Sequence, residues 1–244
     1  MVRIGPVIAL IAQLALLAVL AATVGLSAVG WVFGAGYGLV MNALLAAGLA
    51  RSGATVLGPA NSVTLSRATL VGGVTALISD SFVRGTSVTT IVVLASVALS
   101  LDAVDGRVAR RTRTVSPLGA IFDQEIDAFL IIVLSGYVAD SIGLWVLAIG
   151  AARYAYLAAG WFLPWLRNPL PPRYWGKVVA AIQGIVLTIA VADFLPRPAT
   201  ATVVAVALVL LTESFGRSVW VLWQDHRLPT HHGLALHMRS TGSR

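Results

Sequence analysis

Four aspartates in one expected helical hairpin are the residues of this sequence best suited to chemistry. Asp102 and Asp105 are three residues apart, and Asp123 and Asp127 are four apart, so each pair shares one face of its own helix. The surrounding residues are strongly apolar. A carboxylate inside a membrane span costs about 2.5–3.5 kcal/mol on insertion scales, so these residues need a reason to be there.

The turn between the two helices places the aspartates at matching depths. The step 116–117 is Ser-Pro, which suits a helix cap followed by proline at the first helical position. With the turn centred near Thr114, one aspartate of each helix lies about 13 Å away and the other about 18–20 Å away, at about 1.5 Å per residue. We therefore expect the four carboxylates to meet.

Four ionised carboxylates that meet in a low-dielectric environment repel one another strongly. They must be protonated, paired with cations or bound to metal. An all-oxygen site without Cys or His suits one or two hard divalent ions, Mg²⁺ or Mn²⁺. The alternative is a set of salt bridges to Arg110, Arg153 or Arg173, but such bridges do not require two carboxylates on each of two facing helices.

The composition indicates which elements carry these residues. Hydrophobic residues make up 58% of the 244 residues and charged residues only 11%, against about 25% charged in soluble domains. This predicts an all-α integral membrane protein. Because a spanning helix needs about 20 mostly apolar residues, we expect eight spans: 5–27, 31–50, 65–83, 86–112, 117–138, 143–166, 177–195 and 199–223.

The first span has a second interpretation, since Arg3 before an apolar run is also typical of a signal peptide. The run is longer than the usual apolar region of about 7–15 residues, and a second span follows at once, so a retained helix is favoured.

Basic residues predict the orientation. Most of the sixteen Arg and the single Lys177 fall at alternate ends of the spans or in the two tails, whereas Arg84 and Arg197 fall on the other side and Arg153 lies within a span. The positive-inside rule then places both termini and the aspartate hairpin turn in the cytoplasm of a multi-pass protein of the cell (plasma) membrane. No basic face is interleaved with exposed aromatics, so nucleic acid is not an expected partner.

The polar stretch 51–64 divides the chain. We expect two N-terminal transmembrane helices over 1–50, a catalytic core over 51–225 and a polar cytoplasmic tail over 226–244. The pair His231–His232 in that tail could bind metal, but a solvated tail is the favoured interpretation.

The aspartate segment also carries a family resemblance. It reads Asp102-Ala-Val-Asp105-Gly106-Arg-Val-Ala109-Arg110, eight residues, Gly119, three residues, Asp123, three residues and Asp127. This resembles the signature of the CDP-alcohol phosphotransferase (CDP-alcohol phosphatidyltransferase) family at all eight fixed positions. Two further sets of residues resemble weaker family motifs: Pro59, Asn61, Thr64 and Arg67, and Gly176, Lys177 and Gln183. The resemblance covers about 55–225 and implies a six-helix core preceded by two extra transmembrane helices.

The resemblance implies a phospholipid-synthesis enzyme that moves a phosphatidyl group from a CDP-alcohol, with CDP-diacylglycerol as the expected donor, to an alcohol, with release of CMP. The expected acceptor is inositol phosphate, then glycerol 3-phosphate, then serine or another free alcohol. Membrane lipid and the two substrates are the implied partners, and homodimers are common in the family.

The resemblance also implies residue roles. Two Mg²⁺ or Mn²⁺ ions would be bound by Asp102, Asp105, Asp123 and Asp127, and Asp127 would bind metal or act as the base that takes the acceptor's proton. The residues implied to bind the CDP group are Asn61, Thr64, Asp102, Gly106, Ala109, Arg110 and Gly119.

Three further cations suggest a phosphate pocket for the acceptor. Arg153 lies inside a span, where burial is costly without an anion, and Arg173 and Lys177 are one helical turn apart at the start of the next span. Headgroup contact by Arg173 and Lys177, or an acidic partner for Arg153, are the alternatives. Glu125 lies roughly 200° around the helix from Asp123, so we expect it outside the metal site, paired with a cation on a neighbouring helix.

A cation or proton transporter is the alternative function, because intramembrane carboxylates also mark ion paths. An ion path has no use for a nucleotide-sized gap beside Arg110. Binding of CDP would separate the two functions.

Overall fold

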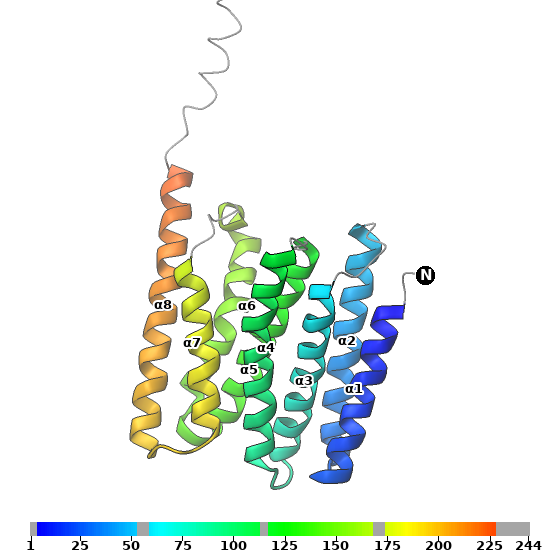
Figure 1. The fold of residues 1–244 in the computed structure, drawn as a ribbon. Helices are drawn as coiled ribbons and strands as arrows, with labels where there is room; N and C mark the ends of the chain where they lie inside the picture. The colour runs from blue at the N-terminus through cyan, green and yellow to red at the C-terminus, as the bar shows by residue number, and fades with distance from the viewer. Residues whose placement is uncertain (1–3, 53–58, 113–116, 168–173, 228–244) are drawn as a thin grey trace, which may run out of the picture.

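The computed structural model describes residues 4–52, 59–112, 117–167 and 174–227, and this part of the chain is entirely helical (Figure 1). It contains eight α-helices and two short 3₁₀-helices. The α-helices are α1 (Ile4–Thr23), α2 (Ala28–Ser52), α3 (Pro59–Ser81), α4 (Val88–Thr112), α5 (Pro117–Ile142), α6 (Leu147–Phe162), α7 (Tyr174–Val191) and α8 (Arg197–Arg227), and the 3₁₀-helices are η1 (Leu144–Val146) and η2 (Pro164–Arg167).

Each of the eight predicted apolar segments forms one helix, so the all-helical prediction is confirmed for the described residues. The main difference lies before the third span, where the polar stretch is shorter than expected. Helix α2 continues to Ser52 and α3 begins at Pro59, because proline is well suited to a first helical position. The aspartate hairpin is also present, with α4 ending at Thr112 and α5 beginning at Pro117.

The helices run side by side along one common direction (Figure 1). Helices α1 and α2 lie at one edge and α7 and α8 at the other, with α3, α4 and α5 between them. Helix α3 packs against α1, α2, α4 and α5, and α5 packs against α3, α6 and α7. The two central helices therefore connect the N-terminal pair to the remaining helices.

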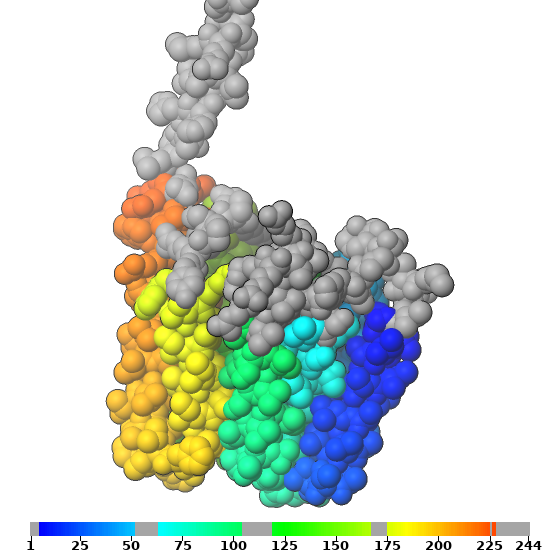
Figure 2. Space-filling view, in the orientation of Figure 1, coloured from blue at the N-terminus to red at the C-terminus, as the bar shows by residue number. Residues whose placement is uncertain are grey.

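One apolar core runs through these central helices. Its fully buried members include Leu77 of α3, Ile91 of α4, Ile126 of α5 and Leu187 of α7. The spaces between the ribbons of Figure 1 are filled by side chains in the space-filling view (Figure 2). This packing holds the helices that carry the aspartates in one register.

The outer surface of the bundle is apolar. Large side chains such as Leu144, Trp161, Phe162 and Phe194 are mostly exposed. Extended apolar surface of this kind is not stable in water and marks contact with a partner or a membrane.

Among the described residues, three helices are long and apolar enough to span a membrane, at Gly5–Thr23, Ala28–Arg51 and Arg197–Gln224. Two shorter apolar stretches follow at Val88–Ala103 and Trp175–Val191. Helices α3 and α5 carry inward-facing charged residues, which lower their hydropathy although they lie in the centre of the bundle. By length and composition, three of the eight predicted membrane spans are therefore supported.

A polar clamp joins the N-terminal pair to α3 at the end of the bundle opposite the aspartate hairpin turn. The buried carboxylate of Asp80 accepts hydrogen bonds from the Ser27 backbone N–H at 2.8 Å and from Arg84 Nε at 2.6 Å. Gly25 in the α1–α2 turn has φ +74°, a conformation that favours glycine, and a Cβ there would lie 3.2 Å from Arg84 Nη2. The clamp thus fixes α2 against α3.

Candidate active site

Carboxylates from two helices meet in the structure. Asp102 of α4 and Asp123 and Asp127 of α5 each present an oxygen within 4.8 Å of the others. The depth match predicted from the hairpin is therefore confirmed for these three. Asp105 lies on α4, but its side chain is outside the described residues.

A buried arginine lies among the three carboxylates. Arg67 Nη1 is 3.0 Å from Asp102 Oδ1 and also donates to Asp123, while Nη2 donates to Asp127. The guanidinium arrives from α3, which packs against both α4 and α5. The Arg67 side chain is 2% exposed, so these ion pairs form inside the bundle.

Sequence reasoning assigned no site role to Arg67, and the salt-bridge alternative named Arg110, Arg153 and Arg173 instead. The predicted bridge from Arg153 to the aspartates is wrong, because Arg153 pairs with Glu125. The side chains of Arg110 and Arg173 are outside the described residues. A usable signal was present, because a charged residue inside an apolar segment requires a partner.

The cluster suits a hard divalent cation even with Arg67 in place. Three carboxylates and one guanidinium leave a formal charge of −2. The carboxylate side chains are also accessible, with Asp102 41% exposed and Asp123 and Asp127 each 34% exposed. An oxygen-only donor set of this charge fits Mg²⁺ or Mn²⁺. The cluster could therefore hold a metal ion.

The N-terminal pair of helices reaches the helix that carries Asp127. The Tyr37 ring of α2 packs on the Phe129 ring of α5 with centroids 4.7 Å apart, and Tyr37 is buried. Helix α2 therefore contacts α5 within one turn of Asp127.

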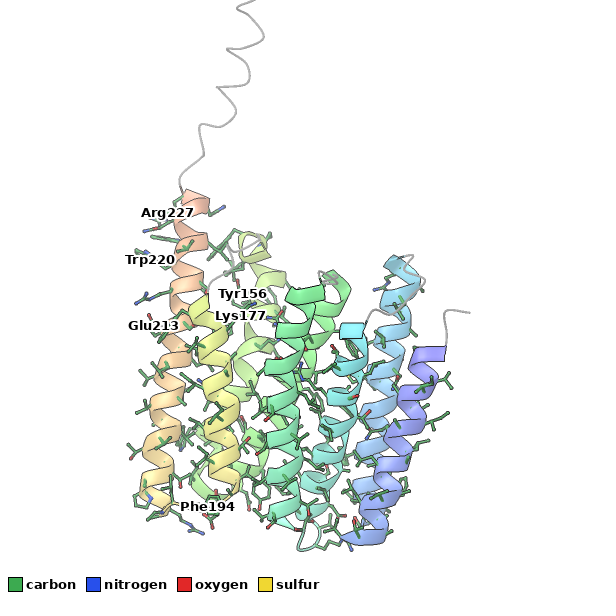
Figure 3. All side chains as sticks on the ribbon, in the orientation of Figure 1. Tyr156, Lys177, Phe194, Glu213, Trp220 and Arg227 are labelled. Atoms are coloured by element: carbon green, nitrogen blue, oxygen red, sulfur yellow. The ribbon has the colours of Figure 1, made fainter. Side chains whose placement is uncertain are left out.

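A cavity of about 330 Å³ opens beside the cluster, between α5, α6, α7 and α8. Its polar lining residues are Gln124, Asp127, Arg153, Tyr156, Gln183, Ser214 and Ser218. Asp127 therefore belongs both to the carboxylate cluster and to the cavity wall. Figure 3 shows Tyr156 of α6 and Lys177 of α7 in the half of the bundle that also contains Arg227, at the end of α8.

Arg153, which lines the cavity, forms an ion pair with Glu125 of α5. This confirms that Glu125 pairs with a cation on a neighbouring helix, and it is the acidic partner that was the alternative for Arg153. The pair does not use every donor, since the buried Nε of Arg153 has no hydrogen-bond partner among the described residues. Arg153 thus lines the cavity with its charge formally balanced by Glu125 and with one N–H group unused.

One residue of the cavity wall, Gln183, also has a hydrogen-bond acceptor that is not used by the described residues. Gln183 of α7 is 1% exposed and donates through Nε2 to the Ala207 carbonyl of α8 at 2.8 Å. Its Oε1 is buried without a hydrogen-bond partner in the described part of the chain. Gln183 therefore joins α7 to α8 in the cavity wall.

The structure describes some of the remaining expected site residues and not others. Thr64 is buried on α3, three residues before Arg67, and Gly119 lies on α5, one turn before Asp123. Lys177 is exposed near the start of α7. Four residues lie within helices but their side chains are outside the described set, namely Asn61, Gly106, Ala109 and Arg110, and Arg173 is outside the described residues altogether.

Fold and cluster together define a class: a protein whose described residues form helices, some of them apolar and of membrane-spanning length, with a partly exposed carboxylate cluster that could hold a metal ion. The family model of the CDP-alcohol phosphatidyltransferases matches residues 57–223, so the chain belongs to that family. Comparisons with curated proteins and with solved structures gave no match. The matched region begins at α3 and includes the cluster and the cavity, while α1 and α2 precede it.

Proposed function

We propose that this protein moves a phosphatidyl group from CDP-diacylglycerol to a polar alcohol and releases CMP, as a step of phospholipid synthesis. The observation that carries the proposal is the double position of Asp127, in the carboxylate cluster and in the wall of the 330 Å³ cavity. One side chain can thereby act on an acceptor in the cavity while the donor phosphate lies at the cluster.

Asp127 is proposed as the base. An acceptor hydroxyl in the cavity would be within hydrogen-bond reach of its carboxylate, which takes the proton as the hydroxyl oxygen attacks the phosphorus that carries the lipid. The bond from that phosphorus to the CMP oxygen breaks, and CMP leaves with the bonding electrons. No covalent intermediate is required.

Asp102, Asp123 and Asp127, together with Asp105 of the same motif, are proposed to hold two Mg²⁺ or Mn²⁺ ions. Bound there, such ions would stabilise negative charge on the phosphate oxygens and on the departing CMP. The CDP group is proposed to contact the helices around the cluster, through Asn61, Thr64, Asp102, Gly106, Ala109, Arg110 and Gly119.

The acceptor is proposed to carry its own phosphate, with inositol phosphate first and glycerol 3-phosphate second. Arg153 lines the cavity, and Lys177 lies on α7, whose Gln183 also lines the cavity. Arg173, four residues before Lys177, is proposed to complete a cationic pocket. The cavity hydroxyls of Ser214 and Ser218 suit a polar acceptor.

We further propose that all eight helices cross the plasma membrane, with both termini and the active site on the cytoplasmic side. The start of α1 and the end of α8 lie at the same end of the bundle in Figure 1, as an even number of spans requires. The division into 1–50, 51–225 and 226–244, and assembly as a homodimer, stay predictions.

The test is CMP release from CDP-diacylglycerol by the purified chain with Mg²⁺ or Mn²⁺, against inositol phosphate, inositol, glycerol 3-phosphate and serine. We expect release with one acceptor, lost on addition of EDTA and in Asp127→Asn. Asp140→Asn is the matched control, since Asp140 is an exposed aspartate near the other end of α5. It should retain the wild-type rate.

Absence of release with every acceptor, in folded protein, would count against the proposed substrates. CDP binding then separates the remaining cases. A chain that binds CDP without turnover uses another CDP-alcohol or acceptor, whereas a chain that binds no CDP is not this enzyme and is better described as an ion transporter.

A further inference from the structure

Arg67 and its three partners differ sharply in exposure. The guanidinium is 2% exposed, whereas each carboxylate side chain is at least one-third exposed. The exposed parts of the carboxylates therefore lie away from the guanidinium. Arg67 forms the inner wall of the cluster, and the outer side is open to a ligand.

Among the described residues, the three carboxylates are the hydrogen-bond partners that orient this guanidinium. Its two Nη groups bond to Asp102, Asp123 and Asp127, while the buried Nε has no hydrogen-bond partner among the described residues. The guanidinium group of Arg67 therefore links α3 to both α4 and α5. A single lysine ammonium would supply the charge but not this planar two-ended geometry.

We propose that Arg67 is an internal counter-cation of the metal site: it balances the carboxylates when no divalent ion is bound, and its charge weakens the binding of that ion. The inference rests on the proposed metal site. Without Arg67, three partly exposed carboxylates would repel one another across two helices, which disfavours the folded state. With Arg67, the metal-free protein stays folded and the ion meets a site of reduced negative charge.

Coulomb's law gives the size of the effect. A unit charge and a double charge about 5 Å apart, the scale of this cluster, repel enough even in bulk water to change an affinity about tenfold. Removing the guanidinium charge should therefore tighten divalent binding by about tenfold or more. The same removal should lower the thermal midpoint of the metal-free protein.

The experiment measures Mn²⁺ binding to the full chain in detergent, from the electron paramagnetic resonance signal of free Mn²⁺, without substrates. Arg67→Met removes the charge, and Arg67→Lys keeps it. Arg84→Met is the matched control, because Arg84 also pairs with a buried aspartate of α3, Asp80, but at the other end of the helix. Thermal midpoints are recorded for each protein with and without Mn²⁺.

We expect a Kd for Mn²⁺ about tenfold lower in Arg67→Met, a Kd within about threefold of wild type in Arg67→Lys, and an unchanged Kd in Arg84→Met. Mn²⁺ should also raise the thermal midpoint of Arg67→Met more than that of wild type. If Arg67→Met cannot be purified, Arg67→Gln also removes the charge and should show the same tighter Mn²⁺ binding; an unchanged Kd in Arg67→Gln would overturn the inference.

Two outcomes would overturn the inference in different ways. Unchanged or weaker Mn²⁺ binding in Arg67→Met, with normal binding by wild type, would show that Arg67 does not oppose the ion. Absence of Mn²⁺ binding by the wild-type chain would refute the proposed metal site itself, and the inference with it.

Discussion

Replacing Arg153 with alanine tests how the acceptor is held. Arg153 comes from α6, lines the cavity beside Asp127 and pairs with Glu125 of α5. Its side chain is 21% exposed, so the charge is largely shielded from water and can act on a ligand in the cavity. The substitution removes the guanidinium and leaves the carboxylate cluster intact.

The expected magnitude follows from the hydrogen bonds that the guanidinium could make. One charge-assisted hydrogen bond to a phosphate contributes about 1.5–3 kcal/mol, which corresponds to about 10- to 150-fold in affinity. We therefore expect Arg153→Ala to raise the KM for a phosphorylated acceptor by about that factor. The KM for CDP-diacylglycerol should stay within about twofold, because the donor is proposed to bind at the cluster.

The assay is the initial rate of CMP release, measured by varying each substrate at saturating levels of the other. The control is Arg217→Ala, which removes an exposed arginine that pairs with Glu213, four residues earlier on α8. Exposed pairs of this kind contribute only about 0–1 kcal/mol, so both KM values should be unchanged.

A second variant separates a phosphate ligand from a structural ion pair. If Arg153 only neutralises Glu125, then adding Glu125→Gln to Arg153→Ala should restore the acceptor KM. If Arg153 binds the acceptor, the double variant should keep the raised KM. Restoration, or an equal rise in both KM values for Arg153→Ala, would refute the phosphate pocket.

Two further predictions concern stability. Asp80→Asn removes the negative charge of the carboxylate that accepts hydrogen bonds from Ser27 and Arg84. We expect a loss of about 1.5–3 kcal/mol in unfolding free energy and an unchanged Kd for Mn²⁺. Wild-type stability in a denaturant titration would show that the clamp is not needed. Gly150→Val places a Cβ 2.5 Å from the Ile132 Cα, so α5 and α6 must separate. We expect a loss of about 1–3 kcal/mol in unfolding free energy and a changed acceptor KM. An unaffected thermal midpoint would contradict this packing argument.

The local features of the site were predictable because they depend on regular helical geometry. The spacing of Asp102, Asp123 and Asp127 about one short turn determines their depth, since each residue advances a fixed distance along its helix. The same regularity placed Glu125 on another face of α5, where it pairs with Arg153. Apolar run lengths likewise predicted the eight helices.

Hydropathy was a weaker guide to which helices span a membrane. In the part of the chain that the structure describes, three helices are both long and apolar enough, and all three lie outside the aspartate hairpin. The central helix α3 carries Arg67 and Asp80 inside the bundle, where each charge has a partner. A helix whose polar residues face protein can be long and buried without being apolar along its whole length.

By itself, the sequence determined the family motif, the helices and the meeting of carboxylates across one hairpin, because these depend on residues close together in the chain. Only the tertiary structure decided that Arg67 enters the carboxylate cluster and that Asp127 also lines a cavity. Those contacts depend on the relative rotation and depth of helices far apart in sequence, which core packing sets and local periodicity does not.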